Sequence, residues 1–251
     1  MSLAYDRLGS GPPLVLLHPL GADRHVWRPV LDRLATERDV IAVDLPGFGD
    51  TPSLNGSGTP APSALARRLA EGLAELGVEA PHVAGNSLGG WVALELALLG
   101  AVQSVTAIAP AGLWPRALGP KPSVARRVAR ALLPVIPALM AVPPIKRFAL
   151  TGTVARPGRV PATDAAGLIR AYVTAPDFVA VNGAMRSSRF ERADDIRVPL
   201  TFGWPSRDRL IARPPRLPSG SRSVVLEGCG HVPMWDDPEA VAELLLSGSL
   251  T

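Results

Sequence analysis

The chain has 251 residues, of which 47% are hydrophobic and 19% charged, as expected for one large folded domain or for a core domain with an insertion. No apolar run approaches the roughly 20 residues that a membrane-spanning helix requires, and the first residues lack the basic start and apolar core of a signal peptide. We therefore expect a cytoplasmic protein without a transmembrane segment. The single cysteine, Cys229, excludes an internal disulfide, and the scattered histidines lack zinc-type spacing.

Positive charge is concentrated in the middle of the chain. Lys and Arg number 26 against 22 Asp and Glu, which gives a net charge of +4. Residues 116–192 hold 13 of the cations and only 3 of the anions, so the remainder is acidic. No helix-turn-helix, zinc-finger or aromatic RNA-binding motif accompanies these arginines, and we expect no nucleic acid partner. The oligomeric state stays open.

Strands and helices alternate through the first 112 residues. Runs typical of strands lie at residues 5–8, 14–17, 40–43, 82–84 and 104–109. Stretches with helical composition or periodicity separate them at residues 23–34, 63–76 and 91–99. This alternation predicts an α/β fold, a mostly parallel sheet with helices on both faces.

The alternation stops at residue 113 and resumes near residue 199. Residues 113–192 contain no comparable strand, and their helical stretches are interrupted by prolines, which bend or end helices. Strands at 199–203 and 223–227 and a helix at 238–246 follow. We therefore divide the chain into a core of residues 1–112 and 193–251 and a helical cap of residues 113–192.

The first helix of the cap has apolar and basic residues at helical spacing. We expect its apolar side to cover the pocket while its arginines face outward, where they attract anionic substrates or a membrane surface. The apolar side is Val124, Val128, Ala131 and Leu132, and the arginines are Arg126, Arg127 and Arg130.

Ser87 lies in a Gly-x-Ser-x-Gly motif between a predicted strand and a predicted helix. The flanking residues are Gly85 and Gly89. A strand-to-helix turn this sharp forces the serine into a strained conformation and leaves no room for a Cβ on either side. The hydroxyl is then exposed above the sheet at a helix N-terminus. A glycine-rich turn whose serine only caps the helix is the alternative interpretation.

A serine hydroxyl needs a base, and His231 is the best-placed histidine. It follows the last predicted strand in a Gly-rich loop, at the sheet edge where active sites of open parallel sheets assemble. Asp208, beyond the strand at 199–203, is our candidate for the carboxylate that orients His231. We expect the four residues before Asp208 to form a short excursion that turns at Pro205. Asp44, at the end of another strand, is the second candidate for the acid.

Acyl transfer also requires donors for the oxyanion. The backbone N–H of Leu88, the residue after the nucleophile, is one candidate. The other is the N–H of Leu20 in the loop His18-Pro19-Leu20-Gly21, because Pro19 has no N–H to give. We expect His18 to hold this loop.

The order Ser87, Asp208, His231, together with the elbow and the His18 loop, resembles the α/β-hydrolase superfamily. The resemblance covers the chain outside residues 113–192. It implies a serine–histidine–acid triad, no cofactor, and a helical cap over the site. Two features depart from the family pattern: Pro19 replaces the usual glycine after His18, and Asp208 lies farther from its strand glycine than usual.

The motifs together predict a serine hydrolase that cleaves a carboxylic ester or related acyl compound through an acyl-enzyme on Ser87. The expected substrate is a small apolar or amphipathic acyl compound, with Trp114 and Trp235 as pocket walls. The same apparatus serves lactonases, thioesterases, cofactor-free haloperoxidases and C–C bond hydrolases, and the sequence does not separate them. A ligand receptor that keeps the triad but turns over slowly is a further alternative.

Overall fold

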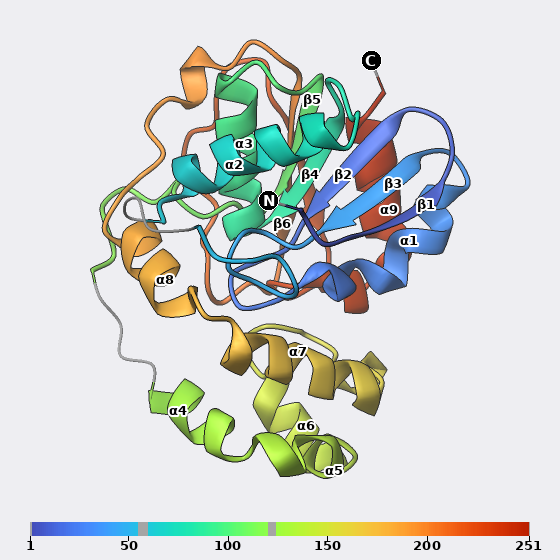
Figure 1. The fold of residues 1–251 in the computed structure, drawn as a ribbon, viewed down its shortest axis with the longest axis vertical. Coiled ribbons are helices and arrows are strands. Elements are labelled where there is room, and N and C mark those ends of the chain that lie inside the picture. The colour runs from blue at the N-terminus through green and yellow to red at the C-terminus, as the bar shows by residue number, and fades with distance from the viewer. Residues whose placement is uncertain (1, 55–59, 120–123, 251) are drawn as a thin grey trace.

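The structure is a computed structural model that describes residues 2–54, 60–119 and 124–250. Its centre is a seven-stranded sheet in the order β1-β3-β2-β4-β5-β6-β7 (Figure 1). β1 runs antiparallel to β3, and the other neighbouring pairs are parallel. The predicted α/β fold is confirmed. The strands are β1 (Tyr5–Gly9), β2 (Pro13–Leu17), β3 (Asp39–Val43), β4 (His82–Asn86), β5 (Ser104–Ile108), β6 (Leu200–Pro205) and β7 (Arg222–Leu226).

Side chains of the central strands alternate between two buried clusters, one on each face of the sheet. In β2, Val15 and Leu17 join the cluster that α2 and α3 cover, whereas Leu14 and Leu16 join the cluster that α1 and α9 cover. Both faces are therefore apolar, which explains the continuous hydrophobic runs in the sequence. The core helices are α1 (Arg28–Ala35), α2 (Pro62–Glu75), α3 (Leu88–Leu98) and α9 (Pro238–Gly248).

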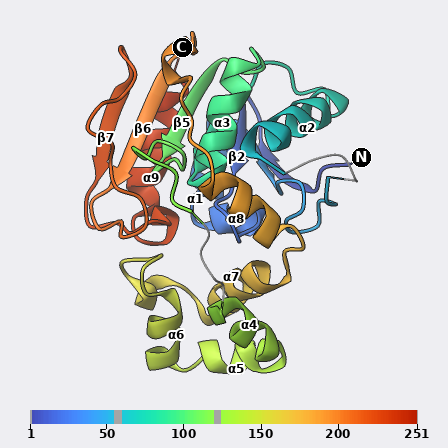
Figure 2. The same ribbon diagram turned by 90° about the vertical axis from the view of Figure 1, so that its left-hand side faces the viewer.

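In the described residues between β5 and β6, the segment predicted to be the cap contains five α-helices. Figures 1 and 2 show α4 to α7 at one end of the molecule, on the side toward which the arrows of β2 and β3 point. α8 packs on the core instead, because Phe178, Val181 and Met185 belong to the cluster of α2 and α3. The cap helices are α4 (Val124–Ala131), α5 (Ile136–Met140), α6 (Pro143–Leu150), α7 (Ala162–Thr174) and α8 (Phe178–Arg186).

Within the described ranges, no single helix is long and apolar enough to cross a membrane. The segments Leu133–Met140 and Pro143–Leu150 pass the test only as a pair, by length and composition, and a bend of 114° separates them.

The predicted orientation of α4 is wrong for its apolar side and for Arg126, whereas Arg127 and Arg130 are exposed as predicted. Arg126 points inward and is 9% exposed, whereas Val128 is 55% exposed and Leu132 is exposed as well. The side chain of Val124 lies outside the described residues. The guanidinium of Arg126 donates to the carbonyl oxygens of Tyr172 (2.9 Å) and Ala175 (2.7 Å) at the end of α7. The final carbonyls of a helix lack partners within the helix and attract a cation, an interaction that helical periodicity does not reveal.

Candidate active site

Ser87 stands at the turn from β4 into α3. Its backbone has φ 57° and ψ −113°, and L side chains rarely adopt positive φ. A Cβ on Gly85 would lie 2.2 Å from the carbonyl oxygen of Gly89, and a Cβ on Gly89 would lie 2.2 Å from that of Leu17. The two glycines therefore allow the helix to approach the strands closely enough to form this turn.

Main-chain hydrogen bonds hold Ser87 in its strained conformation. Its N–H donates to the carbonyl of Ile108 over 2.9 Å, and its carbonyl accepts from the N–H of Ala111 over 2.9 Å. Ser87 is 6% exposed and immediately precedes α3. At that end of a helix the first N–H groups lack acceptors within the helix, and the dipole favours a developing negative charge.

His231 and Asp208 form a buried pair on neighbouring loops. Nδ1 of His231 lies 2.7 Å from Oδ2 of Asp208, and the side chains are 6% and 4% exposed. Because a carboxylate only accepts hydrogen bonds, Nδ1 carries a proton, and in the neutral imidazole Nε2 then has the free lone pair. Oδ1 of Asp208 accepts from the N–H groups of Leu210 (2.7 Å) and Ile211 (3.1 Å), which fixes the carboxylate.

The route of the chain to Asp208 contains the predicted turn at Pro205. β6 continues through Pro205, which is aligned with Leu226 of β7, and the N–H of Asp208 then donates to the carbonyl of Pro205 over 3.1 Å, which closes a turn over Ser206 and Arg207. The N–H of Ser206 then donates to Leu226 over 3.0 Å, and that of Arg207 donates to Cys229 over 2.9 Å. The extra residues therefore extend the pairing with β7 and carry Asp208 to the loop that holds His231.

Two buried side chains that the sequence analysis missed position the His231 loop. Nδ2 of Asn86, the residue before Ser87, donates to the carbonyls of Ile108 (3.1 Å) and His231 (3.0 Å). Asp236 accepts from the N–H of Gly230 (2.8 Å) on one side and from the N–H groups of Ala155 (2.9 Å) and Arg156 (2.6 Å) in the cap on the other. Asn86 thus joins His231 to the elbow, and Asp236 joins its loop to the cap. The Gly-x-Ser-x-Gly pattern contains Asn86, but nothing in the sequence indicates that Asn86 binds the His231 loop or that Asp236 binds the cap.

The loop after β2 abuts the start of α3. Nε2 of His18 accepts from the N–H of Leu45 over 3.0 Å, so Nδ1 carries the proton and donates to the carbonyl of Pro19 over 2.8 Å. Burial lowers the pKa of His18, which keeps the ring neutral. The predicted role of His18 in holding this loop agrees with these contacts. A Cβ on Gly89 would also touch the His18 carbonyl, so the His18 loop lies against the first turn of α3. The half-buried Leu20 of this loop is therefore near Leu88, the first residue of α3.

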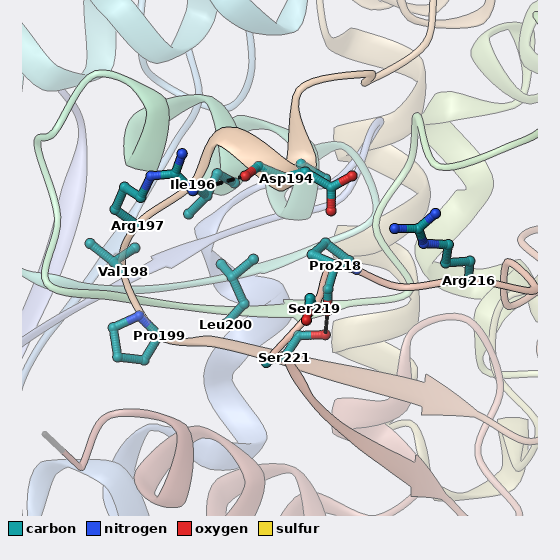
Figure 3. A pocket seen from close by; sticks show the side chains of 12 residues that line it. Asp194, Ile196, Arg197, Val198, Pro199, Leu200, Arg216, Pro218, Ser219 and Ser221 are labelled. Atoms are coloured by element: carbon teal, nitrogen blue, oxygen red, sulfur yellow. Dashed lines mark hydrogen bonds between the residues drawn. The ribbon is translucent and has the colours of Figure 1, made fainter.

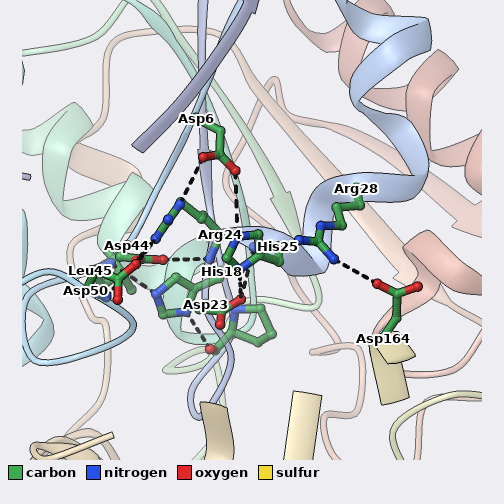
Figure 4. A network of polar contacts seen from close by, with 11 residues as sticks. Asp6, His18, Asp23, Arg24, His25, Arg28, Asp44, Leu45, Asp50 and Asp164 are labelled. Carbon is green, nitrogen blue, oxygen red and sulfur yellow. Dashed lines mark hydrogen bonds and ion pairs between the residues drawn. The ribbon is translucent and has the colours of Figure 1, made fainter. Parts of the chain in front are cut away.

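Asp44 belongs to a different polar network (Figure 4). Its buried carboxylate accepts from the N–H of Arg24 (2.7 Å), from the Arg24 guanidinium and from the N–H of Asp50 (2.9 Å). Burial opposes the charge of Arg24, but Asp50, Asp44 and Asp6 outweigh it and raise the pKa of the guanidinium. The structure therefore joins Asp208 to His231 and engages Asp44 elsewhere.

The two predicted pocket tryptophans lie in different clusters. Nε1 of Trp114 donates to the carbonyl of Ser188 over 3.0 Å, and its ring meets Trp91 edge-on at 5.9 Å. The half-buried Trp235 follows His231 and packs on the cluster of α1 and α9. Its Nε1 is buried without a hydrogen-bond partner in the described part of the chain.

One cavity, of about 390 Å³, lies away from the site (Figure 3). It is lined by residues that precede β6 and β7, including Asp194, Pro199 and Ser221. These positions are at the amino ends of the parallel strands, whereas Ser87, Asp208 and His231 follow carboxyl ends. Because ligands of open parallel sheets bind outside the carboxyl ends, this cavity is not the candidate site.

A second cavity, of about 310 Å³, lies beside the site at the junction of cap and core. Arg207 and Arg209, which flank Asp208, line it together with Gly230, the neighbour of His231. Arg147 and residues of the segment after α6 form its cap side.

Comparisons with known proteins agree with this geometry. Residues 14–244 match the profile of the alpha/beta hydrolase family. An epoxide hydrolase of Mycobacterium tuberculosis is 34% identical over 199 residues, which cover 73% of this chain and 92% of that protein. A pimeloyl-[acyl-carrier protein] methyl ester esterase of Aeromonas hydrophila is 30% identical over 260 residues, with 98% of each chain covered.

Solved structures share the fold as well. A bacterial membrane phospholipase A superimposes with a TM-score of 0.75 at 29% identity, covering 98% of this chain and 82% of the other. The enol-lactonase of Burkholderia xenovorans LB400 gives 0.75 at 20% identity, with 98% and 95% covered. The family profile and the epoxide hydrolase relative show that the chain belongs to the alpha/beta hydrolase family and is a hydrolase.

Proposed function

We propose that Ser87, His231 and Asp208 form a catalytic triad that hydrolyses carboxylic esters. The observation that carries the proposal is the 2.7 Å contact between His231 and Asp208, because it gives the imidazole the tautomer that a general base requires. The strained Ser87 follows Asn86, which holds the backbone of His231. The base and the nucleophile therefore belong to one connected site.

In the proposed reaction Nε2 of His231 takes the proton of the Ser87 hydroxyl while its oxygen attacks the ester carbonyl. The N–H groups of Leu88 and Leu20 stabilise the oxyanion, Leu88 as the first residue of α3 and Leu20 from the adjoining loop. His231 then returns the proton to the departing alcohol. Water activated by His231 attacks the acyl-enzyme, and collapse of the second oxyanion releases the acid and restores Ser87.

The side chain at position 87 favours an acyl substrate over an epoxide. A serine hydroxyl that opened an epoxide would form an ether, which has no carbonyl for water to attack, so the enzyme would stay blocked. A serine that attacks an ester forms another ester, which water hydrolyses. Of the two relatives compared above, the methyl ester esterase therefore gives the better guide to the reaction.

We further propose that the cap covers a site for a small apolar or amphipathic acyl chain. Trp235 follows the His231 loop, and Trp114 lies just after β5, so both adjoin the carboxyl edge of the sheet. A lactone or thioester would present the same carbonyl to Ser87, and a screen of acyl and leaving groups decides among them.

Burst kinetics with a chromogenic short-chain ester test this function. We expect a burst of about one leaving group per chain, because acyl-enzyme accumulates when deacylation is slower than acylation. Ser87→Ala should abolish both burst and turnover while the fold is kept. A wild-type chain that binds the ester without releasing the chromophore would instead be a receptor.

A further inference from the structure

The outer end of the cap carries apolar side chains that the rest of the described chain leaves exposed. Figures 1 and 2 show α4, α5 and α6 at the end of the molecule remote from the sheet. Phe148 is 84% exposed, the most of any large hydrophobic side chain in the described residues. Its exposed apolar companions on these helices and the turns between them are Val128, Leu132, Val135, Val142 and Ile145.

Other residues attach these helices to the rest of the cap. Ile136 and Met140 of α5 and Leu150 of α6 are buried in the cluster that also holds α1 and α9. Arg126 attaches α4 through the carbonyls at the end of α7 and lies 5.0 Å from the ring of Phe178. The exposed apolar side chains are therefore not the ones that hold these helices in place, and an exposed apolar patch marks an interaction site.

The same helices carry positive charge. Residues 124–150 contain five Lys and Arg and no Asp or Glu. Within the described structure, Arg127, Arg130 and Arg147 have no carboxylate partner, whereas Lys146 donates to the carbonyl of Val160 over 2.6 Å. Arg147, next to Phe148, also opens onto the 310 Å³ cavity, whose other cations are Arg207 and Arg209. Exposed apolar groups and uncompensated cations thus occur together at this outer end of the cap.

We propose that this face, formed by α4 to α6, docks onto the surface of an anionic lipid bilayer. Basic residues beside exposed Phe, Leu, Ile and Val are the pattern of helices that lie in the membrane interface, where the apolar groups enter the acyl boundary and the cations meet lipid phosphates. The 114° bend between Leu133–Met140 and Pro143–Leu150 presents Val142 at a corner. Because of this bend, and because Ile136 and Leu150 are buried in the protein, the pair of helices can insert shallowly into the bilayer surface but cannot cross the bilayer.

Charge and shape favour lipid over the other occupants of such a face. If a second copy of the chain docked by the same face, the arginines of the two copies would lie close together and repel one another. An acidic protein would pair the arginines, but Phe148 protrudes and needs a soft apolar medium or a matching pocket. The assignment rests on this surface alone and is independent of the triad. Its consequence for the enzyme is that the mouth of the site lies near amphipathic acyl substrates.

Vesicle co-sedimentation of the full chain tests the docking. Phosphatidylcholine vesicles with and without phosphatidylglycerol separate headgroup charge from apolar insertion. We expect binding to the anionic vesicles that weakens with added salt. Phe148→Ser should weaken it about tenfold, because the transfer of a phenyl group into the acyl region is lost. Leu99→Ser is the matched control: Leu99 is an exposed leucine of the core, remote from the cap, and its loss should leave binding unchanged.

The cations have a test of their own. Arg127→Gln combined with Arg130→Gln should weaken binding to the anionic vesicles on the order of 20-fold and leave binding to neutral vesicles unchanged. Arg213→Gln with Arg222→Gln, two exposed core arginines, should have little effect. Circular dichroism and hydrolysis of a water-soluble ester confirm that each variant is folded.

Three results would overturn the proposal. The first is that the wild-type chain fails to sediment with anionic vesicles at low salt. The second is a dimer that Phe148→Ser dissociates in the absence of lipid, which would make the face an interface between copies. The third is binding to soluble polyglutamate in place of vesicles, unaffected by Phe148→Ser, which would identify an acidic protein as the partner.

Discussion

Replacing Asp208 by Asn tests how the triad is oriented. Oδ2 of Asp208 faces Nδ1 of His231 at 2.7 Å, while Oδ1 accepts from two backbone N–H groups. An asparagine would keep its oxygen on the N–H groups and turn its NH2 toward Nδ1. Nδ1 would then have to accept, the proton would move to Nε2, and His231 could no longer take the Ser87 proton. We expect kcat to fall by about 10⁴, the cost of this tautomer change in a protease triad.

Steady-state hydrolysis of a chromogenic ester measures this loss, and thermal unfolding shows that the fold is kept. Asp44→Asn is the control. Because Asp44 holds Arg24 and Asp50 in a buried network, that change should cost about 3 kcal/mol of stability or more, while the folded enzyme keeps its kcat. If Asp208→Asn retains near-normal turnover while Asp44→Asn loses it, the acid belongs to the other loop and the reasoning is wrong.

Further predictions concern the loops and the turn around the site. Pro19→Gly should lower kcat, because the loop loses the fixed φ of proline, but it should change stability little, because the carbonyl that accepts from His18 and Ala22 remains. An unchanged kcat would show that other contacts shape the loop. Burial lowers the pKa of His18, so the unfolded chain takes up a proton near its ordinary pKa of about 6.5 before the folded chain does. The free energy of unfolding should therefore be constant above this pH, as far as His18 is concerned, and should decline below it by up to about 1.4 kcal/mol per pH unit. The decline should be smaller in His18→Asn, and urea unfolding at several pH values measures both. Gly89→Ala should unfold or severely destabilise the protein because its Cβ would meet the Leu17 carbonyl, whereas Gly167→Ala in α7 has open space and should add about 0.5 to 1 kcal/mol; equal melting temperatures would contradict the packing argument.

Local patterns predicted the parts of the fold and site that depend on local constraints. The alternation of Leu14, Val15, Leu16 and Leu17 between two faces, and the glycines around Ser87, leave each segment few conformations. Their positions in the sequence therefore predicted the sheet and the elbow.

The features that the sequence patterns did not predict depend on contacts between residues far apart in the sequence. The turn at Pro205 was predicted, but the pairing of Pro205 with Leu226 of β7, which helps to bring Asp208 to His231, was not. Arg126 looked like a surface residue, but the carbonyls at the end of α7 draw it inward. Asp236 attracted no attention although it joins the His231 loop to the cap. In each case contacts with distant residues decide the position, and local periodicity does not reveal them.

The most direct test of the account is where a fluorophosphonate reacts. This reagent traps a serine that a neighbouring base has activated, and peptide mass spectrometry locates the adduct. The account predicts one adduct per chain, on the peptide that contains Ser87, absent in Ser87→Ala and much slower in Asp208→Asn. An adduct on a different residue, or continued ester hydrolysis by a chain that the reagent does not label, would contradict the assignment of Ser87 as the nucleophile.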